Sequence, residues 1–232
     1  MKKKILIIVG IIILIVIGVI AYFVITDLQQ EDKLTAELQE ISNLVNSQNI
    51  DIDQINERLD RTVTRGDYAV VEQSFKQYLK DNFDVSMKIA DILNDEKLTT
   101  ILTADNYKQD GKDFVETKNY ISTTRDQLET YKTEYKDFFT EDKVMSYIND
   151  KNLDSYYTDL YKQELVGDIE SDNETEVVES AINDVIGILD IYEEVINFLV
   201  DNQNSWNVQD DTIEFTSESL QNQYNSLIDK LS

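Results

Sequence analysis

Residues 174–202 read ETEVVESAINDVIGILDIYEEVINFLVDN, and this stretch decides the fold class. Its apolar side chains follow two interleaved seven-residue series, one starting at Val178 and the other at Ala181. Further apolar residues widen the stripe that these series would form on one helix. A stripe of this width is typical of the central helix of a bundle, because a two-stranded coiled coil has a narrower seam. We therefore predict a long helix whose Leu189 and Tyr192 side chains face a helical core.

The same periodicity predicts helices on the N-terminal side of this segment. Apolar stripes with steps of three and four residues cover about 34–45, 52–63, 68–93 and 114–138. The stripe over 52–63 is predicted to end at Gly66, since glycine favours the position after a helix. The chain contains no proline, so nothing of that kind interrupts a long helix.

Shorter elements fill the remaining positions. Brief helices are predicted at 96–102, after Thr140, at 157–165 and after Ser217, where a hydroxyl or a local apolar cluster supports each one. Residues 105–113 hold several turn-forming residues and are predicted to be a loop, on the basis of Asn106, Asp110 and Gly111.

One segment departs from helical periodicity. Residues 205–215 read SWNVQDDTIEF, with apolar and polar residues alternating on both sides of Asp210 and Asp211. Two alternating runs around a two-residue turn predict a short β-hairpin. Such a hairpin is marginal by itself and must pack on helices, through Trp206 and Phe215. The predicted fold class is therefore all-α, with one short hairpin near 205–215.

Near the N-terminus, residues 5–25 are uninterrupted by any charged residue and come directly after three lysines at 2–4. A helix of this length spans roughly 31 Å, which matches a hydrocarbon core of about 30 Å. The positive-inside rule places residues 1–4 in the cytoplasm and residues 26–232 outside, as one acidic helical domain. The alternative is a signal peptide cleaved after Ala21, although the apolar run continues beyond that residue.

The charge is distributed unevenly along the chain. Of the 21 basic residues, three precede the apolar run, so the part C-terminal to it carries 18 basic against 46 acidic residues, a formal charge of −28. An acidic surface of this kind repels nucleic acid, which we therefore exclude as a partner. The expected partners are the lipid bilayer, through residues 5–25, and a protein of the cell envelope. Homo-oligomerisation stays open.

Composition excludes several kinds of catalysis. With no histidine and no cysteine, the chain cannot build a Ser-His-Asp triad, a cysteine nucleophile or a His/Cys zinc site. It also lacks a glycine-rich phosphate loop. Pairs of carboxylates would suit a glycoside hydrolase, but 46 acidic residues make such pairs inevitable. We expect no enzymatic activity and no cofactor, with a carboxylate-dependent hydrolase as the remote alternative.

One acidic turn resembles part of a calcium loop. Asp150, Asn152 and Asp154 place oxygen ligands at alternate positions. The pattern then fails, because Ser155 stands where the loop needs glycine and Tyr161 where it needs a bidentate glutamate. We therefore interpret the segment as a polar turn in which Asp154 caps the next helix, and we predict no metal site.

The chain holds 13 tyrosines, and four of them lie close together in sequence. They would form an aromatic platform for a sugar or a peptide if the fold gathered them, and are the candidate ligand-binding residues: Tyr147, Tyr156, Tyr157 and Tyr161. The alternative is that each tyrosine buries its ring at the rim of a bundle and keeps its hydroxyl in water.

In general form the chain resembles envelope proteins of Gram-positive bacteria, with a lysine-rich start, one span and an acidic helical exterior. This likeness is one of composition and points to no site. The expected function is that of a single-pass, membrane-anchored, extracytoplasmic binding or interaction protein without catalytic activity. The alternative is a module that binds a cell-wall polymer or a small ligand through its tyrosine-rich surface.

Overall fold

The computed structural model describes residues 30–45, 51–169 and 174–231. These residues divide into two compact units, and three long helices contribute residues to both. Unit 1 contains residues 91–130 and 179–231, and unit 2 contains the described residues up to 90 together with 131–178. The predicted membrane span at 5–25 lies outside the described residues. Within those residues, no helix is both long and apolar enough to cross a membrane.

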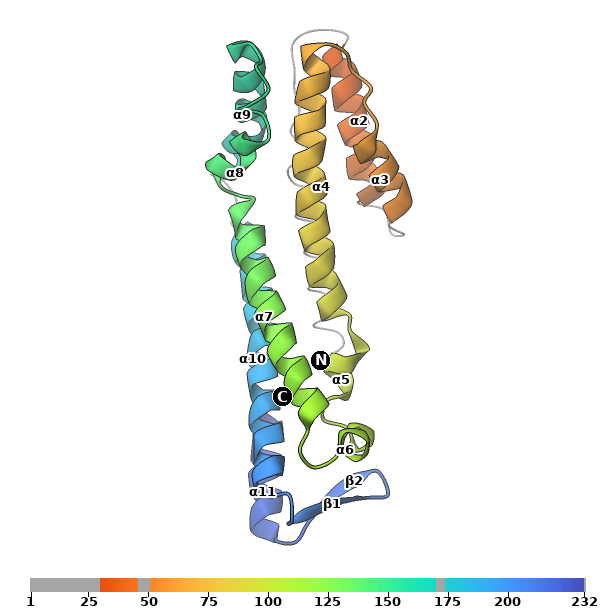
Figure 1. The fold of residues 1–232 in the computed structure, drawn as a ribbon, viewed down its shortest axis with the longest axis vertical. Coiled ribbons are helices and arrows are strands. Elements are labelled where there is room, and N and C mark those ends of the chain that lie inside the picture. The colour runs from red at the N-terminus through yellow and green to blue at the C-terminus, as the bar shows by residue number, and fades with distance from the viewer. Residues whose placement is uncertain (1–29, 46–50, 170–173, 232) are drawn as a thin grey trace. The chain divides into compact units, whose positions relative to one another are not determined.

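Unit 2 is built only from helices in the part of the chain that the structure describes (Figure 1). Its elements are α2 (Gln30–Val45), α3 (Ile52–Asp60), most of α4 (Asp67–Leu93), the end of α7 (Val115–Asp137), α8 (Glu141–Ser146), α9 (Ser155–Ile169) and the start of α10 (Glu174–Asp201).

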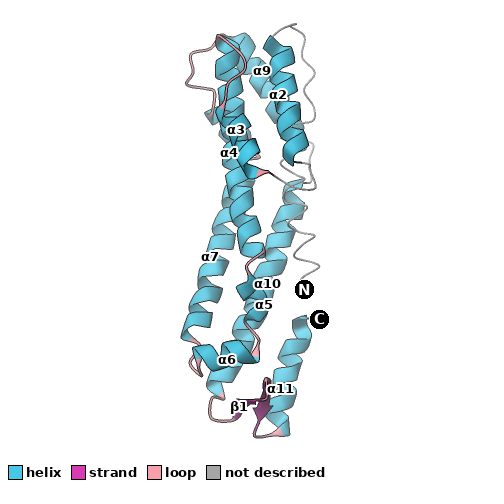
Figure 2. Ribbon diagram, turned by 90° about the vertical axis from the view of Figure 1, so that its right-hand side faces the viewer, coloured by secondary structure: helices cyan, strands magenta, loops and turns pink. Residues whose placement is uncertain are grey.

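Unit 1 adds a small sheet to its helices (Figure 2). It contains the end of α4, α5 (Glu96–Thr100), α6 (Ala104–Asp110), most of α7 and α10, β1 (Trp206–Gln209), β2 (Thr212–Phe215), α11 (Glu218–Ile228) and a final 3-10 turn at Asp229–Leu231. The prediction of a mostly helical chain with one hairpin is confirmed.

The predicted apolar stripes form the cores of both units. In unit 2 the α2 stripe is buried throughout, and the largest buried side chains of this unit come from α4, α7 and α9, namely Phe75, Tyr78, Tyr135 and Tyr161. In unit 1 the face of α10 that carries Leu189 and Tyr192 is buried, as predicted from its width.

Several helices begin at the capping residues that are predicted from the sequence. Thr140 accepts from the backbone N–H of Lys143 and begins α8, and Ser217 accepts from Leu220 and begins α11. Each cap satisfies one of the backbone donors that a helix leaves unpaired at its first turn.

The hairpin forms at the predicted residues. β1 and β2 pair antiparallel, with Trp206 opposite Phe215 and Gln209 opposite Thr212. The two turn residues, Asp210 and Asp211, both have positive φ angles, of 46° and 62°. Positive φ at both positions is the geometry of a type I′ turn, whose twist matches that of the strands.

Two local predictions are wrong. The helix predicted over 52–63 ends at Asp60, six residues before Gly66, because side chains of α4 hold the following backbone in an extended form. The loop predicted at 105–113 is largely the helix α6. Thr103 caps that helix and the buried ring of Tyr107 anchors it, so tertiary contact overrides the turn propensity of its polar residues.

Candidate functional site

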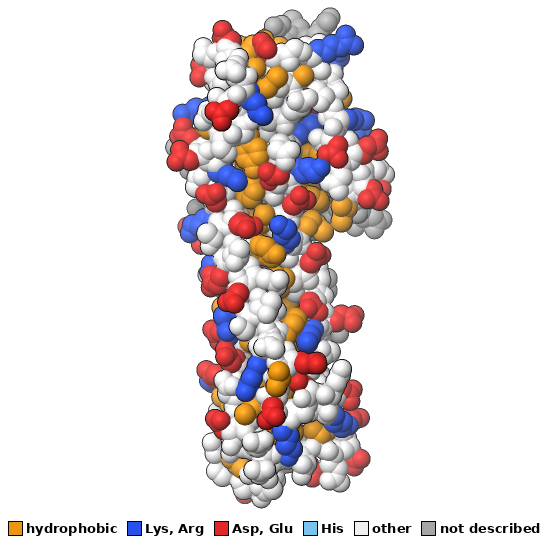
Figure 3. Space-filling model, viewed as in Figure 1, with side chains coloured by type: hydrophobic (Ala, Val, Ile, Leu, Met, Phe, Trp, Pro, Cys, Tyr) orange, Lys and Arg blue, Asp and Glu red, His pale blue; other side chains and the backbone are white. Residues whose placement is uncertain are grey.

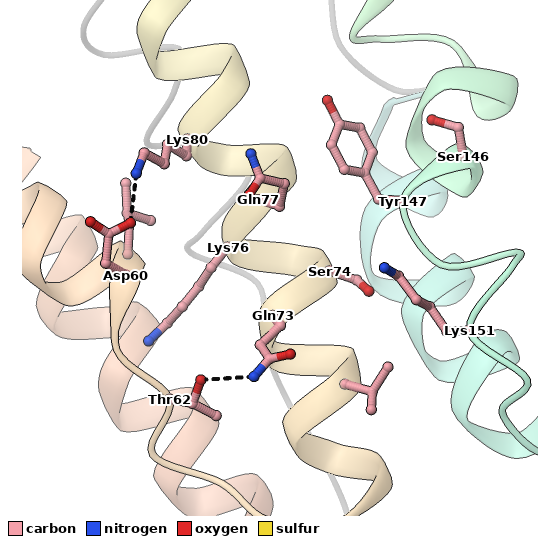
Figure 4. Close-up of a pocket in the computed structure, with 12 residues that line it drawn as sticks. Asp60, Thr62, Gln73, Ser74, Lys76, Gln77, Lys80, Ser146, Tyr147 and Lys151 are labelled. Atoms are coloured by element: carbon pink, nitrogen blue, oxygen red, sulfur yellow. Dashed lines mark hydrogen bonds and ion pairs between the residues drawn. The ribbon is translucent and has the colours of Figure 1, made fainter.

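Unit 2 contains a groove of about 730 Å³ that runs along one face of α4. Its floor comes from α4 residues spaced as one helical face, its first wall from the end of α3 and the residues after it, and its second wall from the end of α8 and the turn after that helix (Figure 4). We call this cavity the α4 groove. It is lined by Leu59, Asp60, Thr62, Val70, Gln73, Ser74, Lys76, Gln77, Lys80, Ser146, Tyr147 and Lys151.

The first wall is fixed by a buried ion cluster. Lys76, only 2% exposed, lies 2.8 Å from Glu72 and 3.2 Å from Glu37. Its ammonium group also donates to the backbone carbonyls of Arg58 and Arg61, at 2.8 and 2.9 Å. The two arginine side chains in turn bind the Glu37 carboxylate. The cluster therefore joins α2, α3 and α4 through charges that are fully paired.

The Glu72 side chain holds the segment after α3 through the backbone N–H groups of that segment. Its carboxylate, which is fully buried, accepts from the backbone N–H groups of Val63 and Thr64 and from the Thr64 hydroxyl, the last at 2.6 Å. These contacts explain why the chain cannot continue α3 to Gly66, since the same N–H groups would otherwise bond within the helix.

Both buried carboxylates stay ionised. Burial would raise the pKa of Glu37, but hydrogen bonds from Arg61 and the charge of Lys76 outweigh it, and the net pKa is lowered. Burial acts in the same direction on the pKa of Glu72, and hydrogen bonds from Lys76, Thr64 and Val63 reverse it in the same way. The cluster thus consists of charges rather than neutral groups at neutral pH.

Most other polar groups of the groove are occupied by contacts within its walls. Lys80 pairs with Asp60 at 2.6 Å, and the Gln73 amide donates to the Thr62 hydroxyl at 3.1 Å. On the second wall, Tyr147 donates its hydroxyl to Asp81 at 2.8 Å. Burial, together with this bond to a carboxylate, raises the pKa of the Tyr147 hydroxyl.

Two groups differ from the rest. The Ser74 hydroxyl is buried, with the residue only 3% exposed, and has no hydrogen-bond partner among the described residues. The Lys151 ammonium has no carboxylate partner within residues 30–45, 51–169 and 174–231. In Figure 4 these two side chains point toward one another across the groove. A buried hydroxyl left unpaired costs about 1–3 kcal/mol, so the arrangement needs an explanation.

The four candidate tyrosines are spread over different surroundings, and only Tyr147 lines the groove. Tyr161 is buried and donates its hydroxyl to the Val144 carbonyl at 3.2 Å. The Tyr157 ring packs edge to face against Tyr68 and Tyr156, with ring centroids 5.1 and 5.2 Å away. Tyr156 is 48% exposed. The structure therefore brings Tyr156 and Tyr157 into contact. Tyr147 and Tyr161 lie in different surroundings, so the four tyrosines do not form one platform.

The acidic side chains of the turn at 150–154 include one that hydrogen-bonds to the backbone of the next helix. Asn152 takes a left-handed conformation, with φ of 52°, and the Asp154 carboxylate accepts from the backbone N–H of Tyr156 at 3.0 Å. Asp154 therefore caps α9, as interpreted from the sequence. Among the described residues no group of acidic side chains is arranged to hold a metal ion.

The sequence alone does not single out Ser74 or Lys151. Ser74 looks like a neutral residue within an amphipathic helix, and Lys151 like a solvated charge in a turn. The polar residues Gln73, Ser74 and Gln77 lie on an amphipathic helix that carries many other polar side chains, so the sequence gives no signal that separates them from the rest.

Comparison with known proteins adds no relative: no protein family, no curated protein and no solved structure matches the chain. A function for this chain has to be inferred from the geometry of its described residues.

Proposed function

We propose that the chain is a non-catalytic binding protein whose α4 groove takes a polar small ligand or a segment of an envelope polymer. The observation that carries this proposal is Ser74, a residue of the groove lining whose hydroxyl is buried and lacks a partner among the described residues. A ligand that hydrogen-bonds to Ser74 would supply the missing partner.

Features of the groove favour binding over catalysis. Among the described residues, the only carboxylate in its lining is Asp60, which is paired with Lys80, whereas glycoside hydrolysis uses two carboxyl groups flanking the bond. A serine nucleophile activated by lysine requires the two side chains within hydrogen-bond reach of each other. No hydrogen bond joins the described side chains of Ser74 and Lys151.

The surface gives less support to an apolar protein-docking face. The described residues include four large exposed apolar side chains, and these lie on four different helices: Ile52, Val115, Tyr156 and Val177. The face shown in Figure 3 carries charged side chains of both signs, with apolar side chains in small patches among them. Scattered apolar residues of this kind are ordinary on a protein surface.

Binding in the groove is tested with Gln73→Trp. Gln73 is exposed on the groove floor, so a tryptophan there should fill the cavity without disturbing the core. We expect the full chain in lipid nanodiscs to bind at least one member of a panel of neutral, acidic and amino sugars, and Gln73→Trp to abolish that binding in calorimetry. The matched control is Gln127→Trp, at an exposed position of α7, which should leave binding unchanged. Equal binding by both variants would show that the groove is not the site.

The placement of the protein is a further part of the proposal. The lysines at 2–4 and the apolar run at 5–25 support an anchored chain whose described residues lie outside the cell. Protease added to intact, wall-stripped cells is expected to remove a C-terminal tag. Complete protection of the tag, lost only when the membrane is permeabilised, would contradict this orientation.

A further inference from the structure

We infer that the ligand of the α4 groove is a hydroxylated anion, a sugar or polyol bearing a phosphate or carboxylate group, held at its charge by Lys151 and Ser74. This inference rests on the proposed function, because it names the class of ligand for the same groove.

The lining of the groove carries more positive than negative side chains. Three lysines face one carboxylate there, in a chain whose formal net charge is −25. Lys76 is neutralised by its buried glutamates, and Lys80 by Asp60. The Lys151 ammonium is the cation of the lining that has no carboxylate partner among the described residues. The uncommitted charge of the groove is therefore positive, and an anionic group complements it.

The Ser74 side chain points toward that charge (Figure 4). Ser74 offers a hydroxyl that is already removed from bulk water. A phosphate or carboxylate oxygen between the two would accept from both groups at once. Hydrogen bonds to an ionised acceptor are shorter and about twice as strong as neutral ones, so this pair selects an anion over a neutral hydroxyl.

The rest of the groove floor offers hydrogen-bond acceptors. The Gln73 and Gln77 amides direct their N–H donors to Thr62 and Asp81, at 3.1 and 2.7 Å. Their carbonyl oxygens are thereby left as acceptors at the groove floor. Acceptors beside an anion site are matched by hydroxyl groups of the ligand, which a bare inorganic anion lacks.

One acidic residue lies near the groove but outside its lining. Asp81 lies on α4 and is absent from the lining of the groove. Its two oxygens accept from the Gln77 amide and from the Tyr147 hydroxyl, so both oxygens are committed to contacts within the protein.

The test compares three probes, glucose, glucose 6-phosphate and glucuronate, by calorimetry on the full chain in nanodiscs. We expect both anionic probes to bind and glucose to bind at least about tenfold more weakly. The stronger of the two anionic probes then identifies phosphate or carboxylate as the group recognised. Inorganic phosphate alone should bind more weakly than glucose 6-phosphate, because it cannot reach the floor acceptors.

Two variants separate this inference from a structural effect. Lys151→Gln should weaken binding of the anionic probe about tenfold, whereas Lys118→Gln, which removes the same charge from unit 1, should not. Ser74→Ala should weaken binding while leaving the melting temperature equal or higher, because the hydroxyl has no partner among the described residues to lose.

Three outcomes would overturn the inference. Glucose binding as tightly as its anionic derivatives, with Lys151→Gln unaffected, would refute the anion class while leaving the groove as a binding site. No binding by any of the three probes would refute the hydroxylated anion. Unchanged affinity in Ser74→Ala would remove the serine from the site. Failure of the proposed function itself would be seen separately, as ligand binding that Gln73→Trp does not affect.

Discussion

Replacing Lys76 with methionine is expected to destabilise the packing of α2, α3 and α4 by about 3–5 kcal/mol. The variant leaves Glu37 and Glu72 buried without their shared cation, and it removes two hydrogen bonds to the carbonyls of Arg58 and Arg61. An uncompensated buried charge is far more costly than the loss of a surface pair. Urea denaturation followed by circular dichroism measures the effect, and faster hydrogen exchange at Val63 and Thr64 locates it.

Lys80→Met is the matched control, because Lys80 lies one turn further along the same helix. Its pair with Asp60 is largely exposed, at 32% and 63% for the two side chains, so the expected loss is below about 1 kcal/mol. A Lys76→Met, Glu72→Gln double variant should recover part of the stability, since it removes the isolated charge. Equal losses of stability in Lys76→Met and Lys80→Met would show that the buried cluster stabilises the fold no more than an exposed ion pair.

The same cluster determines how these helices respond to acid. Glu37 and Glu72 have pKa values lowered by folding, so their ionised forms stabilise the folded state above the ordinary carboxyl value of 4.5. This stability is lost as the pH falls from 4.5 through the lowered pKa values of the folded state. Lys76→Met should therefore show a weaker stability loss between about pH 5 and about pH 3 than the unaltered chain, because its Glu72 carboxylate loses a group that lowers its pKa.

Regular elements could be predicted from the sequence because local and long-range signals agree in them. The α10 stripe, the Thr140 and Ser217 caps and the Asp210-Asp211 turn each combine a pattern with a residue suited to its conformation. The errors occur where distant side chains decide the backbone. Nothing in the sequence near Asp60 indicates that Glu72, on the next helix, will take the N–H groups of the segment after α3.

The groove depends on three-dimensional proximity in the same way. Ser74 and Lys151 are far apart in sequence, and each has an ordinary interpretation when considered alone. Their significance comes from what other residues do: Lys80 is neutralised by Asp60, and the Tyr147 hydroxyl is occupied by its bond to Asp81. An uncommitted group can be recognised only after the partners of its neighbours are known, and those partners are set by tertiary contacts.

Replacing Trp206 with alanine is expected to destabilise unit 1 by about 3–5 kcal/mol. Trp206 is 2% exposed and packs against Tyr107 and Phe114, with ring centroids 6.1 and 6.0 Å away. Its indole N–H donates to the Leu199 carbonyl at the end of α10, at 2.7 Å. A two-stranded hairpin is not stable alone, and this ring fastens β1 to the rest of unit 1 together with hydrogen bonds from Lys112 to Trp206 and Asn207. Urea denaturation of the full chain by circular dichroism measures the loss, and hydrogen exchange across 205–215 should rise with it.

Two further variants distinguish anchoring from general damage to the strand. Trp206→Phe keeps an apolar ring but leaves the Leu199 carbonyl without its indole donor, so an intermediate loss is expected. Val208→Ala removes a half-buried side chain from the same strand and should cost about 1 kcal/mol or less. The hairpin would be held mainly by its own strand pairing if Trp206→Ala cost no more than Val208→Ala. We expect alanine at 206 to be the most severe because it removes both the buried ring and its hydrogen bond, whereas phenylalanine removes the hydrogen bond and only part of the buried surface.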